Sequence, residues 1–69
     1  MTELNKTLFK IKMLENKVNV AELAKELDVD KQTIYNRLNG RTPFTLQEVR
    51  FLRNKFNLTD DEVVEIFLN

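Results

Sequence analysis

The stretch VAELAKELDVDKQTIYNRLNG, residues 20–40, decides the fold because it holds two short helical patterns with almost no chain between them. Only residues 27–30 are left for the connection, and so short a turn forces the two helices to cross steeply. Ala24 is small enough to lie at the crossing, and Asp28 tolerates a positive φ better than most residues. Apolar side chains that would close the pair follow: Val29, Ile34 and Leu38. The stretch therefore predicts a helix-turn-helix over about residues 20–39.

The starts of the helices are marked by Asn or Thr followed three residues later by Glu, a spacing in which the two residues cap a helix reciprocally. This spacing begins at Asn19, Thr45 and Thr59. Asp30 is the expected cap of the helix that ends at Gly40, because glycine adopts the left-handed conformation beyond a helix end easily. With a further helix over about residues 5–16, the chain is predicted to form a compact all-α bundle of five helices, in one domain over residues 1–69.

The chain has more large apolar side chains than one small core usually needs. The expected inward stripe of the first helix is Leu4, Leu8, Ile11, Leu14 or Glu15, and Val18. In the helix after Thr45, the expected inward residues are Leu46, Val49 and Leu52, and Phe44 is expected to dock on the core. The surplus predicts a protein interface made of Phe9, Met13, Phe51, Val64, Phe67 and Leu68. The alternative is that all of them fit one tightly packed core.

The composition argues against several classes of site. The chain has no cysteine and no histidine, so it lacks thiolate ligands and the side chain best suited to proton transfer near pH 7. It has no recognisable nucleophile–base set and no glycine-rich phosphate loop, so we expect no enzyme activity, cofactor, metal or small-molecule substrate. Its apolar runs are too short to cross a membrane and its first residues do not form a secretory signal, so the expected location is cytoplasmic.

Charge is distributed unevenly along a chain whose formal net charge is zero. Residues 31–55 contain six basic side chains and one acid, whereas residues 56–69 contain four acids and no base. A basic segment of this kind can attract a polyanion despite the neutral total. The alternative is an ordinary solvated surface.

The segment LAKELDVDKQTIYNRLNG resembles the helix-turn-helix of phage Cro and repressor proteins and their bacterial, XRE-like relatives, and the predicted five-helix layout is similar over nearly the whole chain. It departs from the family pattern in two places, because Asp28 replaces the usual turn glycine and Leu38 lies four rather than three places after Ile34. In this family the second helix of the motif lies in the major groove of DNA. The resemblance implies a lambda-repressor-like fold and a transcription regulator that binds double-stranded operator DNA.

The resemblance also implies which residues contact DNA. Base contacts fall on Lys31, Gln32, Thr33 and Asn36, and contacts to the phosphate backbone on Asn19, Arg37, Asn39, Arg41 and Thr42. Their chemistry is suitable, since an amide can pair with adenine and a lysine can donate to guanine. The alternatives are a polar, solvated helix face for the base contacts and simple capping for Asn19. Three further side chains have two candidate roles, DNA contact or contacts within the protein: Tyr35, Arg50 and Arg53.

Two protein partners are compatible with the apolar surplus. The first is a second copy of the chain, because a homodimer places two recognition helices one DNA turn apart. The second is a phage repressor, because some small Cro-like proteins, the antirepressors or modulators of repression, bind a repressor and alter its operator contacts. The acids of residues 60–65 are suited to a basic partner of that kind. The sequence thus leaves two functions open, a Cro-like regulator and an antirepressor in the lysis–lysogeny switch.

Overall fold

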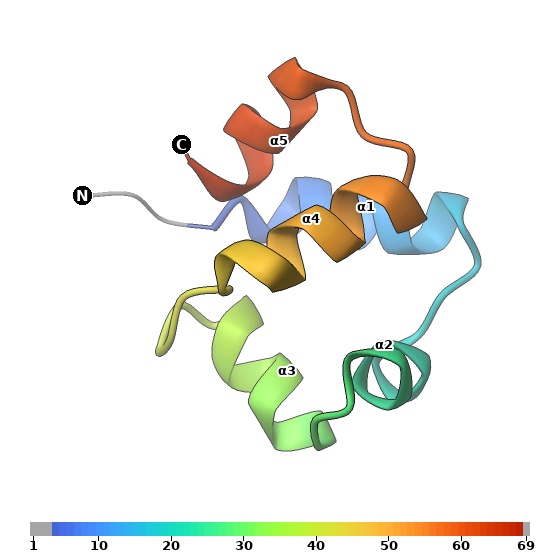
Figure 1. Ribbon diagram of the computed structural model, residues 1–69, viewed down its shortest axis with the longest axis vertical. Coiled ribbons are helices and arrows are strands. Elements are labelled where there is room, and N and C mark those ends of the chain that lie inside the picture. The colour runs from blue at the N-terminus through green and yellow to red at the C-terminus, as the bar shows by residue number, and fades with distance from the viewer. Residues whose placement is uncertain (1–3, 69) are drawn as a thin grey trace.

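The computed structural model describes residues 4–68, and over these residues it consists of five α-helices and their connections (Figure 1). The helices are α1 (Lys6–Glu15), α2 (Val20–Leu27), α3 (Lys31–Leu38), α4 (Leu46–Lys55) and α5 (Asp60–Phe67). The prediction of an all-α, five-helix bundle is therefore confirmed.

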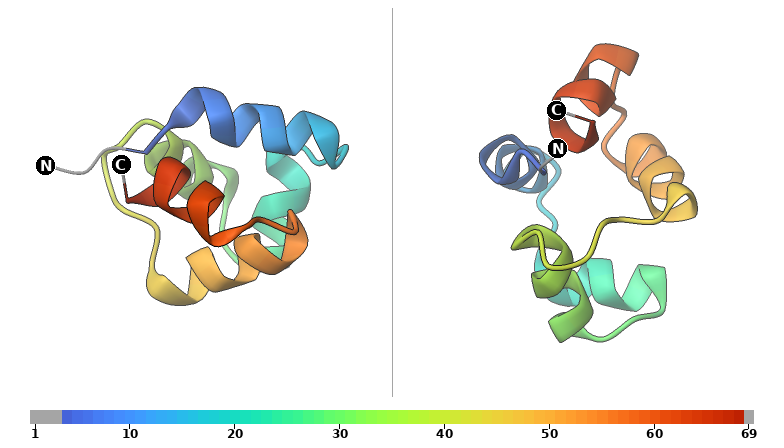
Figure 2. Two further views of the ribbon diagram at one scale, coloured as in Figure 1. Left: turned by 90° about the horizontal axis from the view of Figure 1, so that it is seen from above. Right: turned by 90° about the vertical axis from the view of Figure 1, so that its left-hand side faces the viewer.

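The helices form two groups. α2 packs against α3, and α5 packs against both α1 and α4. The pair α2–α3 makes the lower part of the molecule in Figure 1, and the other three helices make the upper part, as Figure 2 shows from the side. The backbone N–H of Asn5 donates to the carbonyl oxygen of Ile66 at 2.8 Å, so the start of α1 lies beside the end of α5.

Every helix begins at a residue whose side chain accepts a hydrogen bond from a backbone N–H in the first turn. These caps are Asn5, Asn19, Asp30, Thr45 and Thr59. Complete capping boxes are present at Thr45 and Thr59, as predicted. At Asn19 the structure forms only the bond from the Glu22 N–H, so the predicted box is half present there.

Four helices end in the same way, with a left-handed residue directly after the last turn. Among the described residues these are Lys17, Asp28 and Asn57, with φ of 56°, 58° and 51°, and Gly40, with φ of 76°. In each case the next N–H reaches back five residues, as Val29 does to the carbonyl of Ala24 at 2.9 Å. The predicted left-handed conformations of Asp28 and Gly40 are confirmed, and the Asp28 turn joins α2 to α3.

The core is centred on Phe9 of α1, which is fully buried. Its ring lies 5.5 Å from that of Phe44, 5.7 Å from that of Phe56 and 6.0 Å from that of Phe67, between ring centroids. Such stacked and edge-on pairs add stability beyond the burial of their apolar area. The predicted docking of Phe44 on the core is confirmed. The other fully buried large side chains come from the four remaining helices: Leu23, Ile34, Leu52 and Ile66.

The predicted inward face of α1 is wrong in part, since Leu4, Leu8 and Val18 pack against the core as predicted but Ile11 and Leu14 do not. Ile11 and Leu14 are 43% and 77% exposed, whereas Phe9 and Met13 are 0% and 8% exposed. Apolar side chains lie on more than one side of α1, and the aromatic cluster around Phe9 turns Phe9, rather than Ile11 and Leu14, into the core. Phe9 and Met13 therefore do not belong to a surface interface, contrary to the prediction.

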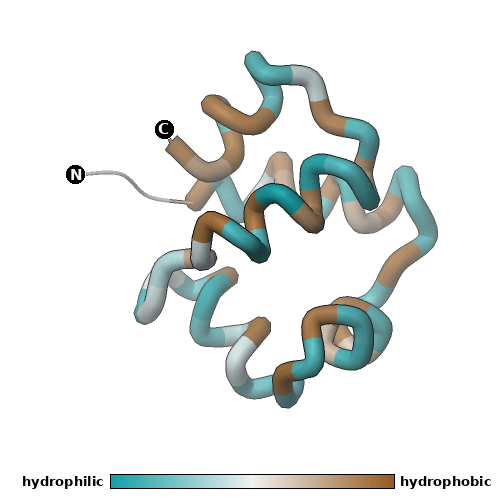
Figure 3. The backbone as a smooth tube through the Cα atoms, viewed as in Figure 1, coloured by the Kyte–Doolittle hydropathy of each residue, from teal (hydrophilic) through white to brown (hydrophobic). Residues whose placement is uncertain are grey.

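The rest of the apolar surplus is divided between core and surface. Phe51 and Phe67 are half-buried and pack against the core, whereas Val64 and Leu68 are 51% and 60% exposed. Leu46, predicted to face inward, is 66% exposed because it occupies the first turn of α4, at the edge of the bundle. The end of α5 is apolar almost throughout (Figure 3), and its exposed side chains are what is left of the predicted protein interface.

Candidate nucleic-acid interface

α3 has one side in the core and one side in solvent. Ile34 and Leu38 are buried at 1% and 5% exposure. Lys31, Gln32 and Tyr35 are exposed, and Asn36 is half-buried. The Asp28 turn lays α3 across α2, so the polar side of α3 faces outward, as the sequence predicts.

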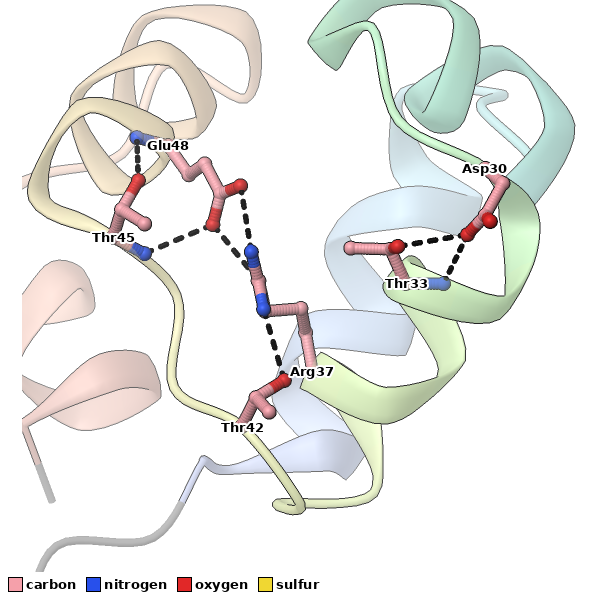
Figure 4. A network of polar contacts seen from close by, with 6 residues as sticks. All are labelled: Asp30, Thr33, Arg37, Thr42, Thr45 and Glu48. Atoms are coloured by element: carbon pink, nitrogen blue, oxygen red, sulfur yellow. Dashed lines mark hydrogen bonds and ion pairs between the residues drawn. The ribbon is translucent and has the colours of Figure 1, made fainter.

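The start of α3 is fixed by Asp30. Its Oδ1 accepts hydrogen bonds from the hydroxyl and the backbone N–H of Thr33, each at 2.7 Å (Figure 4). These bonds, the hydroxyl's first, hold the pKa of Asp30 below its usual value. Because the hydroxyl of Thr33 already donates to Asp30, the methyl group is the part of this side chain that has no polar partner to satisfy.

Two of the predicted base contacts bind each other. The side-chain Nε2 of Gln32 donates to Oδ1 of Asn36 at 3.1 Å. The residues are four apart on one helix, a spacing that brings side chains together on the same face. The structure thus joins Gln32 and Asn36 into a pair, with Lys31 next to it at the first position of the helix.

Arg37 lies between α3 and α4 rather than in solvent. Its Nε and Nη2 donate to the two carboxylate oxygens of Glu48 at 3.0 and 3.1 Å, and its Nη1 donates to the hydroxyl of Thr42 at 2.9 Å (Figure 4). Burial raises the pKa of Glu48, but hydrogen bonds from Arg37 and Thr45 outweigh it and leave the pKa below its usual value. The guanidinium of Arg37 is therefore committed inside the molecule, which differs from the predicted phosphate contact.

The segment after α3 carries the other predicted backbone contacts. Asn39, Arg41 and Thr42 are all exposed, and the Gly40 turn returns the chain so that the Arg41 N–H donates to the carbonyl of Asn36 at 2.9 Å. Sequence analysis missed Lys6, whose Nζ donates to Oδ1 of Asn39 at 2.8 Å. No sequence signal pairs two residues so far apart, and only the packing of the bundle brings this cation to the end of α3.

A shallow, mainly apolar hollow lies beside the start of α3. Lys10, Asn19, Lys31 and Tyr35 contribute to its lining. Around this hollow, α1 and the start of α2 therefore lie next to the exposed side of α3. The side chain of Asn19 is occupied as a cap, since its oxygen accepts from the Glu22 N–H at 2.8 Å.

A profile of the helix-turn-helix family matches residues 9–63, which include all of α2, α3 and α4. The chain belongs to this helix-turn-helix family. Searches of curated proteins and of solved structures gave no match. The family comprises XRE-type DNA-binding transcription regulators, so this helix-turn-helix protein is a DNA-binding transcription regulator whose partner is double-stranded DNA.

The helix-turn-helix protein has less basic charge available for DNA than residues 31–55 suggest. Three of the six bases in that segment form ion pairs: Arg37–Glu48, Arg53–Asp60 and Lys55–Glu26. The structure thus shows Arg53 balancing an acid of α5, one of the two roles considered for it. Within residues 4–68, Lys31, Arg41 and Arg50 form no ion pair, so their positive charges are not balanced by a neighbouring acid.

Three further findings concern membranes, metal ions and the family of this helix-turn-helix protein. None of its helices is both long and apolar enough to cross a bilayer. Between residues 4 and 68, no three side chains of the metal-ligating types are grouped closely enough to hold an ion. Its family is one of regulators that typically have no enzymatic activity.

Proposed function

We propose that this chain is a phage Cro-type regulator that binds operator DNA by placing α3 in the major groove. The observation that carries the proposal is the division of α3, in which Ile34 and Leu38 are held in the core while Lys31 and Gln32 are exposed. Helices of this motif meet base edges with the residues near their N-terminus. The proposed base contacts are Lys31, Gln32 and Asn36, with the methyl of Thr33 beside them.

The proposed phosphate contacts lie at both ends of the motif. Beyond α3 they are Asn39, Arg41 and Thr42, which are exposed, with Lys6 as an added cation beside Asn39. At the start of α2 the proposed contact is Asn19, next to the free N–H groups of the helix end. Arg37 is left out because Glu48 holds its guanidinium.

The active form in this proposal is a homodimer on a palindromic operator. Two-fold symmetry would set the two copies of α3 one turn of DNA apart, about 34–36 Å. The candidate contact between copies is the exposed apolar end of α5, with Val64 and Leu68. Sedimentation equilibrium of the wild type and of Val64→Asp tests this part, because a single aspartate in that contact should shift the protein to monomer.

Binding-site selection from a random duplex library, followed by anisotropy titration at several salt concentrations, tests the main proposal. We expect saturable binding to one enriched sequence. Because the cations proposed to contact DNA are Lys6, Lys31 and Arg41, the logarithmic salt slope should correspond to about three phosphates per copy, near −2.7 at about −0.9 per phosphate. Absence of saturable binding to any duplex would overturn the proposal.

The antirepressor remains the second candidate, because one observation favours it. α5 contains four acids and no base, and two of the acids, Asp61 and Glu65, form no ion pair within the described residues. The same end of the chain carries the exposed Val64 and Leu68. Such a surface suits a basic, DNA-binding partner. Size-exclusion chromatography with the N-terminal domain of a phage repressor distinguishes the two functions, since a stable complex together with no saturable binding to DNA would favour the antirepressor.

A further inference from the structure

The hydrogen bond between Gln32 and Asn36 changes the chemistry that α3 offers to DNA. The Nε2 of Gln32 donates one hydrogen to Oδ1 of Asn36, at 3.1 Å. Gln32 keeps its carbonyl oxygen as an acceptor and its second N–H as a donor. Asn36 keeps both of its N–H donors, whereas its oxygen already accepts from Gln32.

The two side chains are therefore suited to different bases. Adenine presents an acceptor, N7, next to a donor, the N6 amino group, and a free amide pairs with both at once. Gln32 still has one group of each kind. Asn36 offers mainly donors, which suit the acceptors of guanine or the O4 atom of thymine. The side chain of Asn36 also has less conformational freedom than that of Gln32, because Asn36 is half-buried and Gln32 is exposed.

We propose that Gln32 and Asn36 read DNA as one unit, in which Asn36 is the positioning residue that fixes the side chain of Gln32 against its base. This inference rests on the proposed function, because it requires α3 to lie in the major groove. In water a hydrogen bond between two amides is weak, but it gains strength when the DNA excludes solvent from the pair. A long, flexible glutamine fixed in this way loses less freedom on binding than a free one.

A double-mutant cycle on the selected duplex tests the inference. Gln32→Ala and Asn36→Ala should each reduce the preference for the selected over a scrambled duplex by about 5- to 150-fold, the range of one good base contact. The double variant should lose little more than the worse single variant, because either substitution already breaks the unit. Gln32→Ala combined with Arg41→Ala is the matched control, read as affinity for the selected duplex because a phosphate contact carries no sequence preference. There the two losses of affinity should multiply, because these residues share no hydrogen bond.

Selection repeated with Asn36→Ala provides a second readout. We expect this variant to relax base preference at the position read by Gln32 as well as at its own position, a change that a loss of folding would not produce. Circular dichroism melting of each variant verifies that the fold is retained.

The outcomes separate the two claims. The inference would be overturned if the losses of Gln32→Ala and Asn36→Ala multiplied in the double variant, or if Asn36→Ala relaxed base preference at one position only. Either result would leave DNA binding by α3 intact. Failure of the wild type to bind any duplex would overturn both.

Discussion

Arg37 and Glu48 join α3 to α4 through a two-pronged ion pair, with their side chains only 16% and 13% exposed. The same carboxylate also accepts the Thr45 N–H at 2.9 Å, which completes the cap of α4. Glu48 therefore caps the start of α4 and at the same time binds α3 through Arg37. The pair ties the helix proposed to read DNA to the rest of the bundle.

Replacing Arg37 by alanine should lower the free energy of unfolding by about 2 kcal/mol, because the largely buried carboxylate of Glu48 loses its charged partner. Urea denaturation measures the change. Arg50→Ala on α4 is the matched control, since Arg50 is exposed and forms no ion pair within the described residues, and its effect should stay within about 0.5 kcal/mol. Equal effects of the two substitutions would show that the Arg37 pair is not a structural contact.

Stability should decrease in acid, because carboxylates at helix starts are stabilised in their charged form. The pKa of Glu48 is lowered as described above, and hydrogen bonds from Lys12 and from the start of its own helix lower the pKa of Glu62. A carboxyl whose pKa is lower in the folded state contributes stability above its unfolded pKa, and this is lost as the pH falls. The free energy of unfolding should be level near neutral pH and fall below the ordinary glutamate value of 4.5.

Urea midpoints measured between pH 7 and pH 3 examine this decrease. Glu48→Gln should be less stable at pH 7 and should show a shallower decline in acid, because it removes one of the titrating groups. A decline as steep as that of the wild type would mean that Glu48 does not contribute to it.

Phe9 and Leu14 lie on the same helix and should respond very differently to truncation. Phe9→Ala should cost about 3–5 kcal/mol, because the ring is fully buried among three other aromatic rings. In a chain of 69 residues this loss can abolish folding, so Phe9→Leu serves as the milder variant. Leu14→Ala should change stability by less than about 0.5 kcal/mol, since Leu14 is 77% exposed. A larger loss of stability for Leu14→Ala than for Phe9→Leu would indicate that Leu14 faces the core, as the sequence predicts, and would contradict the structure.

Lys17 is the least suitable of the three non-glycine residues with positive φ. Lysine gains no local hydrogen bond in this conformation, whereas asparagine and aspartate adopt it more readily. Lys17→Gly should therefore raise the free energy of unfolding by about 0.5–1 kcal/mol, and Asn57→Gly by less. Thermal unfolding followed by circular dichroism measures both, and a loss of stability in Lys17→Gly would contradict the assigned turn.

The sequence predicts the helix starts well because the signals are local. A cap and the N–H groups that it serves are separated by three residues, and the turn between α2 and α3 is decided by Asp28 and its neighbours. The outward side of α3 follows in the same way from Ile34 and Leu38. Each of these features depends on residues within one or two turns of helix.

The features that sequence analysis missed depend on contacts across the bundle. α1 carries apolar side chains on more than one side, and the rings of Phe44, Phe56 and Phe67 turn Phe9 into the core while Ile11 and Leu14 stay exposed. The ion pair of Arg37 and the bond from Lys6 to Asn39 likewise join residues far apart in the chain. Charge counted along residues 31–55 overestimates the basic surface for the same reason.

Chemical-shift mapping tests most directly the claim that the outer side of α3 reads DNA. Addition of the selected duplex to ¹⁵N-labelled protein should move the backbone signals of Lys31 and Gln32 and the side-chain amide signals of Gln32 and Asn36 most, and leave α4 near Arg53 unchanged. Largest shifts along α5, with the signals of α3 unmoved at saturation, would contradict the account.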